Sequence, residues 1–178
     1  MPKEAKPEEK KRPVRKKKTS KDYAIELLIK VAVTVVLVLI LCFCVIGIHI
    51  NHGNASYPMI KDGDLVITYR LQAPKAGDEI AYTKDGVFKL GRVVAVGGDE
   101  VEINDSYVTV NGLGIAEDAV YPTSSAGADI AFPYKVPDNS FFVLNDFRSD
   151  KNDSRSFGAV SDKECEGTVF LILRRRGI

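Results

Sequence analysis

A continuous apolar segment near the N-terminus is the strongest pattern in the chain. It runs from Val31 to Ile48, eighteen residues without a charged side chain and rich in Val, Leu and Ile. A helix of about 17–25 residues crosses a hydrocarbon layer of roughly 30 Å. Residues 23–30 (YAIELLIK) lead into this segment, and the long side chain of Lys30 can reach back to the headgroups. The pattern predicts one transmembrane helix over residues 23–50.

This helix is interpreted as an uncleaved anchor. Its apolar core is longer than the about 7–15 residues of a usual signal-peptide core. A cleavage site of the A-x-A kind does not directly follow, and Gly53-Asn54-Ala55 is a poor substitute.

From Asp64 onward, apolar and polar positions alternate, which is typical of strands. The alternation predicts strands over residues 64–71, 78–84, 87–96, 101–103, 107–110, 140–144 and 168–173. Asp85-Gly86 is a two-residue hairpin signal, and residues 112–138 are expected to be loop-like. Many short strands without an amphipathic helix predict an all-β fold, an antiparallel, barrel-like domain over residues 51–178.

The charges are unevenly distributed along the chain, although the formal net charge is only +1. The first 21 residues contain ten Lys or Arg against three Glu, together with three prolines. Such a segment cannot bury enough apolar surface to fold, so residues 1–22 are predicted to form a disordered tail. Positive charge marks the cytoplasmic side of a membrane helix. We therefore expect a single-pass protein of the cell membrane, with the β domain outside, rather than a nucleic-acid-binding tail.

Cysteines and histidines indicate no separate site. Cys42 and Cys44 lie within the predicted span and Cys165 is alone in the outer domain, so the three cannot form a disulfide framework. His49 and His52 have H-x-x-H spacing, but two histidines without a third ligand are more typical of an interface than of a metal site. Neither a metal nor another cofactor is expected.

Four segments of the outer domain, in order along the chain, carry a family resemblance. They are Gly53–Ile60 with Asp62-Gly63-Asp64, Gly77–Ile80, Gly91–Asp99, and Val136–Arg148 with Asp153-Ser154-Arg155 and Phe157-Gly158. They resemble the G-x-S-M-x-P-T, G-D-I-V, K-R-V-x-G-x-P-G-D and G-D-N-R-x-x-S-x-D-S-R boxes of bacterial type I signal peptidases with a single anchor. The resemblance covers most of residues 31–173 and implies the β domain of a membrane-bound serine protease.

The two catalytic positions of that family carry no chemistry in this chain. In the family, a serine attacks the peptide carbonyl and a buried neutral lysine takes its proton. Alignment on Pro58 places Ala55 at the serine position, and alignment on Arg92 places Gly91 at the lysine position. Covalent catalysis needs a nucleophile within reach of its base, and losing such a unit costs on the order of 10⁶ in turnover. The chain is predicted not to be a working peptidase.

The resemblance also implies a site frame that persists without the dyad. Arg92 and Asp146 resemble one charge pair of the family, and Asp153 and Arg155 resemble another. Ordinary surface pairs, worth about 0–1 kcal/mol, are the alternative interpretation. The predicted frame comprises Pro58, Asp78, Arg92, Asp146, Arg148, Asp153, Ser154 and Arg155.

A binding or assembly role fits such a frame. Strand addition of an extended segment depends on backbone hydrogen bonds and side-chain pockets, so it can persist without catalysis. The resemblance extends to dyad-less relatives associated with sortase-built pili of Gram-positive bacteria, where they aid pilin polymerisation. It implies a pilin subunit or a sortase as partner, with signal-peptide-like extended segments as further ligands.

Two alternatives stay open. The first is an active signal peptidase with a rearranged dyad, in which Ser56 is the nucleophile and Lys89 or Lys151 the base. Lys89 shares a strand face with Gly91, and Lys151 takes the place of a serine that borders the family's lysine. Against this, a shift of one residue turns an extended side chain to the other face. The second is a membrane-proximal scaffold in which residues 174–176, all arginine, touch anionic lipid.

Overall fold

The computed structural model describes residues 19–104, 106–115 and 122–174, in two units that comprise residues 1–39 and 40–178. Helix α1 (Ser20–Ile40) continues into a π-helical turn, η1 (Leu41–Val45). Together they form one segment of 26 residues that is long and apolar enough to cross a membrane. This agrees with single-pass anchoring. The disorder predicted for the basic tail concerns residues that lie almost entirely outside the described ranges.

Residues 46–50, which the hydrophobic pattern assigned to the transmembrane helix, form strand β1 (Ile46–Ile50). This strand pairs antiparallel with β2 (Leu65–Tyr69), from Ile46 opposite Tyr69 to Ile50 opposite Leu65. Isoleucine is common both in membrane helices and in strands. Pairing with β2, which a local apolar pattern does not contain, decides between the two.

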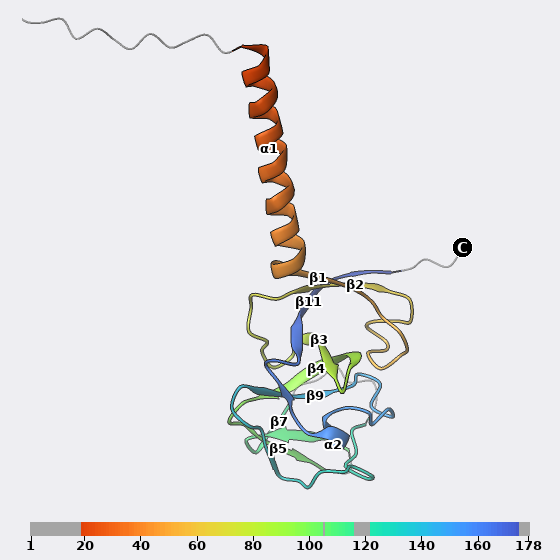
Figure 1. The fold of residues 1–178 in the computed structure, drawn as a ribbon. Coiled ribbons are helices and arrows are strands. Elements are labelled where there is room, and N and C mark those ends of the chain that lie inside the picture. The colour runs from red at the N-terminus through yellow and green to blue at the C-terminus, as the bar shows by residue number, and fades with distance from the viewer. Residues whose placement is uncertain (1–18, 105, 116–121, 175–178) are drawn as a thin grey trace, which may run out of the picture. The chain divides into compact units, whose positions relative to one another are not determined.

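The β domain consists of two antiparallel sheets (Figure 1). The larger has the order β1-β2-β11-β3-β4-β9-β10, and the smaller has the order β7-β6-β5-β8. The further strands are β3 (Glu79–Lys84), β4 (Val87–Val96), β5 (Glu100–Ile103), β6 (Val108–Val110), β7 (Leu113–Gly114), β8 (Tyr134–Lys135), β9 (Ser140–Leu144), β10 (Val160–Ser161) and β11 (Cys165–Leu173). The predicted all-β, antiparallel class is confirmed. The large sheet is open in the described ranges, with β1 and β10 at its edges, so it does not close into a barrel.

The predicted hairpin lies between β3 and β4. Asp85 and Gly86 have φ angles of 52° and 78°, the left-handed values that a two-residue turn of this type requires. The segment expected to be loop-like supplies β7 and β8, each of two residues. A short helix, α2 (Ser154–Phe157), begins after Asp153, whose side chain accepts a hydrogen bond from the Arg155 backbone N–H.

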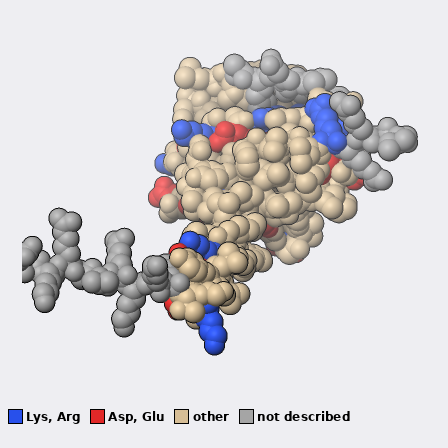
Figure 2. Space-filling model, turned by 90° about the horizontal axis from the view of Figure 1, so that it is seen from above, with Lys and Arg blue, Asp and Glu red and all other residues tan. Residues whose placement is uncertain are grey.

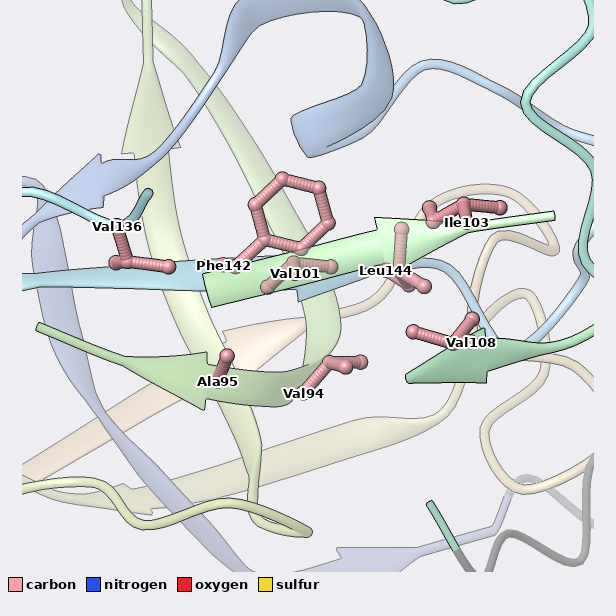
Figure 3. Close-up of a cluster of buried hydrophobic side chains, with 8 residues drawn as sticks. All are labelled: Val94, Ala95, Val101, Ile103, Val108, Val136, Phe142 and Leu144. Atoms are coloured by element: carbon pink, nitrogen blue, oxygen red, sulfur yellow. The ribbon is translucent and has the colours of Figure 1, made fainter. Parts of the chain in front are cut away.

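Buried apolar side chains form three clusters. The largest joins the two sheets and draws on β4, β5, β6 and β9 (Figure 3). A second lies among β3, β4, β9 and β10 and includes Tyr82 and Val143. A third contains Ile60 together with residues of β2, β3 and β4. β1 contributes to none of these clusters in the described ranges.

The outer side of β1, β2 and β11 is an exposed apolar surface. The strand register places its members on one side of the sheet: Ile46, Ile48, Ile50, Leu65, Ile67, Tyr69, Leu171 and Leu173. We call this set the apolar face. Ile48 is 60% exposed and Ile50 is 54% exposed, although a soluble monomer rarely leaves so many adjacent apolar side chains in water. Figure 2 looks onto this end of the domain and shows a surface that is mostly uncharged.

Candidate functional site

The loop that matches the first box holds Ala55 and Ser56 in different surroundings. Ala55 is half-buried, and its carbonyl accepts a hydrogen bond of 2.9 Å from the backbone N–H of Phe147. Ser56 is 1% exposed. The next residues form a cis Tyr57-Pro58 bond, and Met59 contacts Arg92. The loop is thus hydrogen-bonded to the segment around residue 147. At position 55 it carries the methyl group of alanine, where the resembling family has a serine hydroxyl.

Gly91 lies in the middle of β4 and has no room for a side chain. A Cβ at this position would come 2.6 Å from Val143 Cγ1, 3.4 Å from the Leu144 carbonyl oxygen and 3.6 Å from Tyr82 Cε1. Carbon atoms in contact prefer about 3.5–4.0 Å. Val143 and Tyr82 are both fully buried in the second apolar cluster. The space that a lysine would enter is therefore filled.

Arg92, the residue after Gly91, points to the opposite side of the sheet and organises a polar cluster. Its Nε and Nη2 donate to the two carboxylate oxygens of Asp146, at 2.7 and 2.6 Å. Its Nη1 donates to the Gly77 carbonyl at 2.8 Å, and Nη2 lies 3.4 Å from Glu79 Oε2. The predicted Arg92–Asp146 pair is thus present, in a bidentate form that fixes geometry better than a single contact.

Glu79 is a member of this cluster that sequence reasoning missed. The family has an apolar residue at this position of the G-D-I-V box, and here a carboxyl with 4% of its residue surface exposed takes that place. Burial, and then the charge of Asp146, raise the pKa of Glu79 from 4.5 to about 8. Ser56, Arg92 and Arg148 oppose the rise in the pKa. The Ser56 hydroxyl and the carboxyl approach each other without the geometry of a full hydrogen bond. Glu79 is therefore largely protonated at neutral pH.

The second predicted pair, Asp153 and Arg155, is completely buried. Arg155 Nη2 donates to Asp153 Oδ2 at 2.7 Å and Nε donates to Oδ1 at 2.9 Å, with both side chains 0% exposed. Arg155 also donates to the carbonyls of Arg148 and Asp150. These hydrogen bonds join Arg155 to its own loop, and a longer one of 3.5 Å reaches the Ser124 carbonyl of another segment. This pair is not the ordinary surface pair that was the alternative interpretation.

The remaining frame residues support neighbouring backbone. Ser154 Oγ accepts a hydrogen bond of 2.9 Å from the Val143 N–H. Arg148 is 2% exposed and donates to Thr123 Oγ1 at 2.7 Å. Asp78 accepts a hydrogen bond of 2.9 Å from the Lys75 N–H, within its own turn. The frame is therefore built around Arg92 and Arg155, with Asp78 contributing to a turn.

The alternative dyad residues are not brought together. Ser56 lies against Glu79, on the side of the β3–β4 pair that carries Arg92. Lys89 lies in register with Tyr82, on the side that carries Gly91, and its Nζ donates to the Asn152 carbonyl at 3.2 Å. Burial lowers the pKa of Lys89, as a base would need. The lysine nevertheless occupies the wrong side of the sheet for Ser56.

Lys151, the other candidate base, makes its hydrogen bond to a different segment. Its Nζ donates to the Ala126 carbonyl, in the segment that follows residue 121. Ser156 Oγ donates to the Lys151 carbonyl at 2.7 Å. Within the described ranges, His, Cys, Asp and Glu side chains form no group of three or more that could hold a metal ion.

An antiparallel β domain follows one helix that is apolar and long enough to span a membrane, and two charge pairs, Arg92–Asp146 and Asp153–Arg155, hold its loops in the way that the family resemblance predicts. The family model described as signal peptidase, peptidase S26, matches residues 24–174. The chain therefore belongs to the signal peptidase S26 family.

Some of the similar proteins are named signal peptidase I, and others are named inactive signal peptidase. A probable signal peptidase I-2 of Synechocystis is 30% identical over 115 residues, which are 59% of this chain and 50% of that protein. Signal peptidase I S of Bacillus subtilis is 27% identical over 70% of this chain and 74% of its own length. An inactive signal peptidase IA of Staphylococcus aureus is 28% identical over 71% of this chain and 78% of its own length. A solved signal peptidase I of Enterococcus faecalis aligns at a TM-score of 0.48 and 25% identity, over 56% of this chain and 98% of that chain.

Proposed function

We propose that this chain is a non-catalytic signal-peptidase-like membrane protein that assists pilin assembly by binding pilin or sortase at the outer surface of the cell membrane. One observation carries the non-catalytic part. Ala55 and Gly91 offer no nucleophile and no base, and Val143 and Tyr82 fill the space beside Gly91. Relatives of similar identity are named inactive signal peptidase IA, which supports the same interpretation.

Binding is the role that the remaining frame supports. The Arg92–Asp146 and Asp153–Arg155 pairs fix the loops around the former catalytic positions through at least four charge-assisted hydrogen bonds. Preformed loops reduce the ordering cost of capturing an extended peptide. Recognition by backbone hydrogen bonds needs no nucleophile. Pilin and sortase are proposed as partners from the resemblance to dyad-less relatives.

The test of the non-catalytic function uses the full chain in lipid nanodiscs. It is mixed with a signal-peptide substrate that ends in A-x-A, and both cleavage and binding are recorded, with a dyad-intact signal peptidase as positive control. Binding without cleavage is expected. Cleavage that disappears in Ser56→Ala would overturn the proposal in favour of a rearranged protease. Site-specific crosslinking around Ala55 to pilin and to sortase then tests the partners, and capture of neither would refute the assembly role.

The β domain is further proposed to rest on the membrane through the apolar face. The face is uncharged over three strands, and β1 follows directly after the apolar helix and η1 in the sequence. Each exposed isoleucine gains about 0.8 kcal/mol per buried CH₂ group on entering an apolar layer. Lipid is thus a favourable occupant for this face.

Because the chain contains no tryptophan, a single introduced tryptophan tests this placement. Ile48→Trp should be quenched by brominated lipids in nanodiscs, while Tyr107→Trp, at a site that is 59% exposed outside the apolar face, should not. Equal quenching of the two, or none at Ile48, would contradict a membrane-facing apolar face.

A further inference from the structure

Two arginines lie at opposite ends of the apolar face. Arg70 directly follows Tyr69 at the end of β2, and Arg174 directly follows Leu173 at the end of β11. The register pairs Leu173 with Leu65, so Arg174 lies beside the start of β2, six positions from Arg70 along that strand. At about 3.3 Å per residue, the two strand ends are roughly 20 Å apart. The apolar face therefore carries a positive charge at each end.

Arg70 is held at the point where the chain leaves the apolar helix. It is exposed, and its Nη1 donates a hydrogen bond of 2.8 Å to the Phe43 carbonyl. Phe43 lies in η1, at the end of the segment that is long and apolar enough to cross a membrane. A Cβ at Gly47 would come 3.3 Å from Arg70 Nη2, so the guanidinium also lies against the backbone of β1. The charge is thus fixed close to the end of the apolar segment.

Arg174 is held at the other end by a longer contact. It is exposed, and its Nη2 donates to the Met59 carbonyl at 3.5 Å. A guanidinium has five N–H donors in a planar fork. Within the described ranges, Arg70 and Arg174 each make one hydrogen bond. Most of their donors can therefore bind a further acceptor.

The carboxylates on or next to these three strands point into the domain. Asp64, which precedes β2, is 3% exposed. The Glu166 carboxylate of β11 lies 3.5 Å from Nε2 of His49, a residue that alternates with the exposed isoleucines of β1 and so lies on the other side of the sheet. In the described part of the chain, no ion pair joins Arg70 or Arg174 to a carboxylate. The two positive charges at the apolar face are therefore not neutralised by an ion pair within the domain.

Negative charge gathers in the smaller sheet and its turns. The described residues between 97 and 139 include five acidic side chains and one basic side chain: Asp99, Glu100, Glu102, Asp129, Asp138 and Lys135. Figure 1 shows β5 and β7 of this sheet at the end of the β domain away from β1. An acidic end is repelled by an anionic surface, and a basic end is attracted to it. The charge distribution therefore favours an orientation in which the apolar face meets an anionic surface.

We propose that Arg70 and Arg174 bind the phosphate groups of anionic phospholipids, so that the apolar face rests preferentially on an acidic membrane surface. This inference rests on the proposed membrane placement of the apolar face and names the lipid that the face selects. The planar guanidinium fork matches two phosphate oxygens at once. A zwitterionic lipid carries a cation beside its phosphate, so the net charge of an anionic lipid makes it the better partner. Because roughly 20 Å separates the two strand ends, each arginine binds its own lipid.

The full chain in nanodiscs tests this lipid selection, with Ile48→Trp as the reporter of lipid contact. The discs contain a fixed share of brominated phosphatidylcholine, and the remaining lipid is either phosphatidylcholine or phosphatidylglycerol. Quenching over a salt series gives the ratio of docked to undocked domain, which phosphatidylglycerol should raise and salt should lower. Added to the reporter, Arg70→Gln and Arg174→Gln should each lower this ratio about five-fold in anionic discs, the factor for about 1 kcal/mol per basic residue near the surface. Neither should change the ratio in phosphatidylcholine.

Lys135→Gln is the matched control, because it removes an exposed positive charge from β8 of the smaller sheet and should leave the ratio unchanged. If circular dichroism shows that Arg70→Gln does not fold, Arg174→Gln alone decides. An equal effect of Lys135→Gln, or no effect of the arginine variants in anionic discs, would overturn the proposal. Strong quenching that is the same in both kinds of disc would overturn lipid selection and leave the membrane placement intact. No quenching in either kind of disc would refute both.

Discussion

Replacing Gly91 with alanine is expected to destabilise the β domain, although alanine is usually the better residue in a strand. The new methyl group would lie 2.6 Å from Val143 Cγ1, about 1 Å closer than two carbon atoms prefer. Val143 cannot move aside easily, because β-branched side chains are stiff at χ1 and this one is 0% exposed. Its backbone N–H is also bonded to Ser154 Oγ.

Two opposing effects set the size of this change. Overpacking of a filled core costs about 1–3 kcal/mol. Removing a glycine lowers the entropy of the unfolded chain, which returns about 0.4–1 kcal/mol. The net loss is therefore at most about 2.6 kcal/mol and centred near about 1.3 kcal/mol. At about 2–4 °C per kcal/mol, the midpoint of thermal unfolding should fall by roughly 3–5 °C.

Thermal unfolding followed by circular dichroism, together with a double-mutant cycle, measures this. Val143→Ala alone should cost about 1.6 kcal/mol, for two lost methyl groups at about 0.8 kcal/mol each. Since the methyl group introduced by Gly91→Ala would occupy part of the vacated space, the double variant should be more stable than additivity predicts, by at least about 1 kcal/mol. Gly114→Ala is the control, because nothing lies within 4 Å of a Cβ there. If Gly91→Ala leaves the free energy of unfolding unchanged and the effects of the two substitutions simply add in the double variant, the argument that the space beside Gly91 is filled is refuted.

Two further variants probe the buried charges. Glu79→Gln should raise the free energy of unfolding, and the gain should grow as the pH rises from about 4.5 to about 8, because folded Glu79, with its raised pKa, keeps a proton that the unfolded chain releases. Denaturant titrations at several pH values measure this gain. A difference in free energy between variant and parent that does not change with pH would contradict the assigned pKa. Asp153→Ala should destabilise the domain by about 3–5 kcal/mol, since the guanidinium of Arg155 would be left buried without its carboxylate. Urea unfolding measures this loss, and a cost below about 1 kcal/mol would mean that the pair acts like an exposed one.

Most of the larger strands could be predicted because their pattern is local. The alternation over residues 87–96 and the Asp85-Gly86 turn are recorded in the sequence itself, and the structure has β4 over the same residues. β1 could not be predicted, because Ile46, Ile48 and Ile50 continue an apolar run that fits a helix equally well. What makes them a strand is the edge of β2, which a local pattern does not contain.

The candidate site was predictable where the family resemblance supplies it. The Arg92–Asp146 and Asp153–Arg155 pairs were identified from their boxes, and the structure brings each together. Glu79 was missed, because a glutamate in an alternating strand normally faces water. Only the approach of Ser56, Asp146 and Arg92 from other segments buries it. The crowding beside Gly91 was equally hidden, since it depends on Val143 of β9.

The hydrogen-bonded loop around Arg155 has a consequence for how such genes are interpreted. The guanidinium bonds to Asp153, Arg148 and Asp150 in its own loop and, at 3.5 Å, to the Ser124 carbonyl, and none of these partners is at position 55 or 91. Substitutions at positions 55 and 91 therefore leave these bonds untouched, and an inherited architecture can outlive the reaction for which it is named. The D-S-R end of the fourth box (Asp153-Ser154-Arg155) is evidence of ancestry rather than of turnover, so genome surveys that count peptidases by these residues would include chains of this kind among the enzymes.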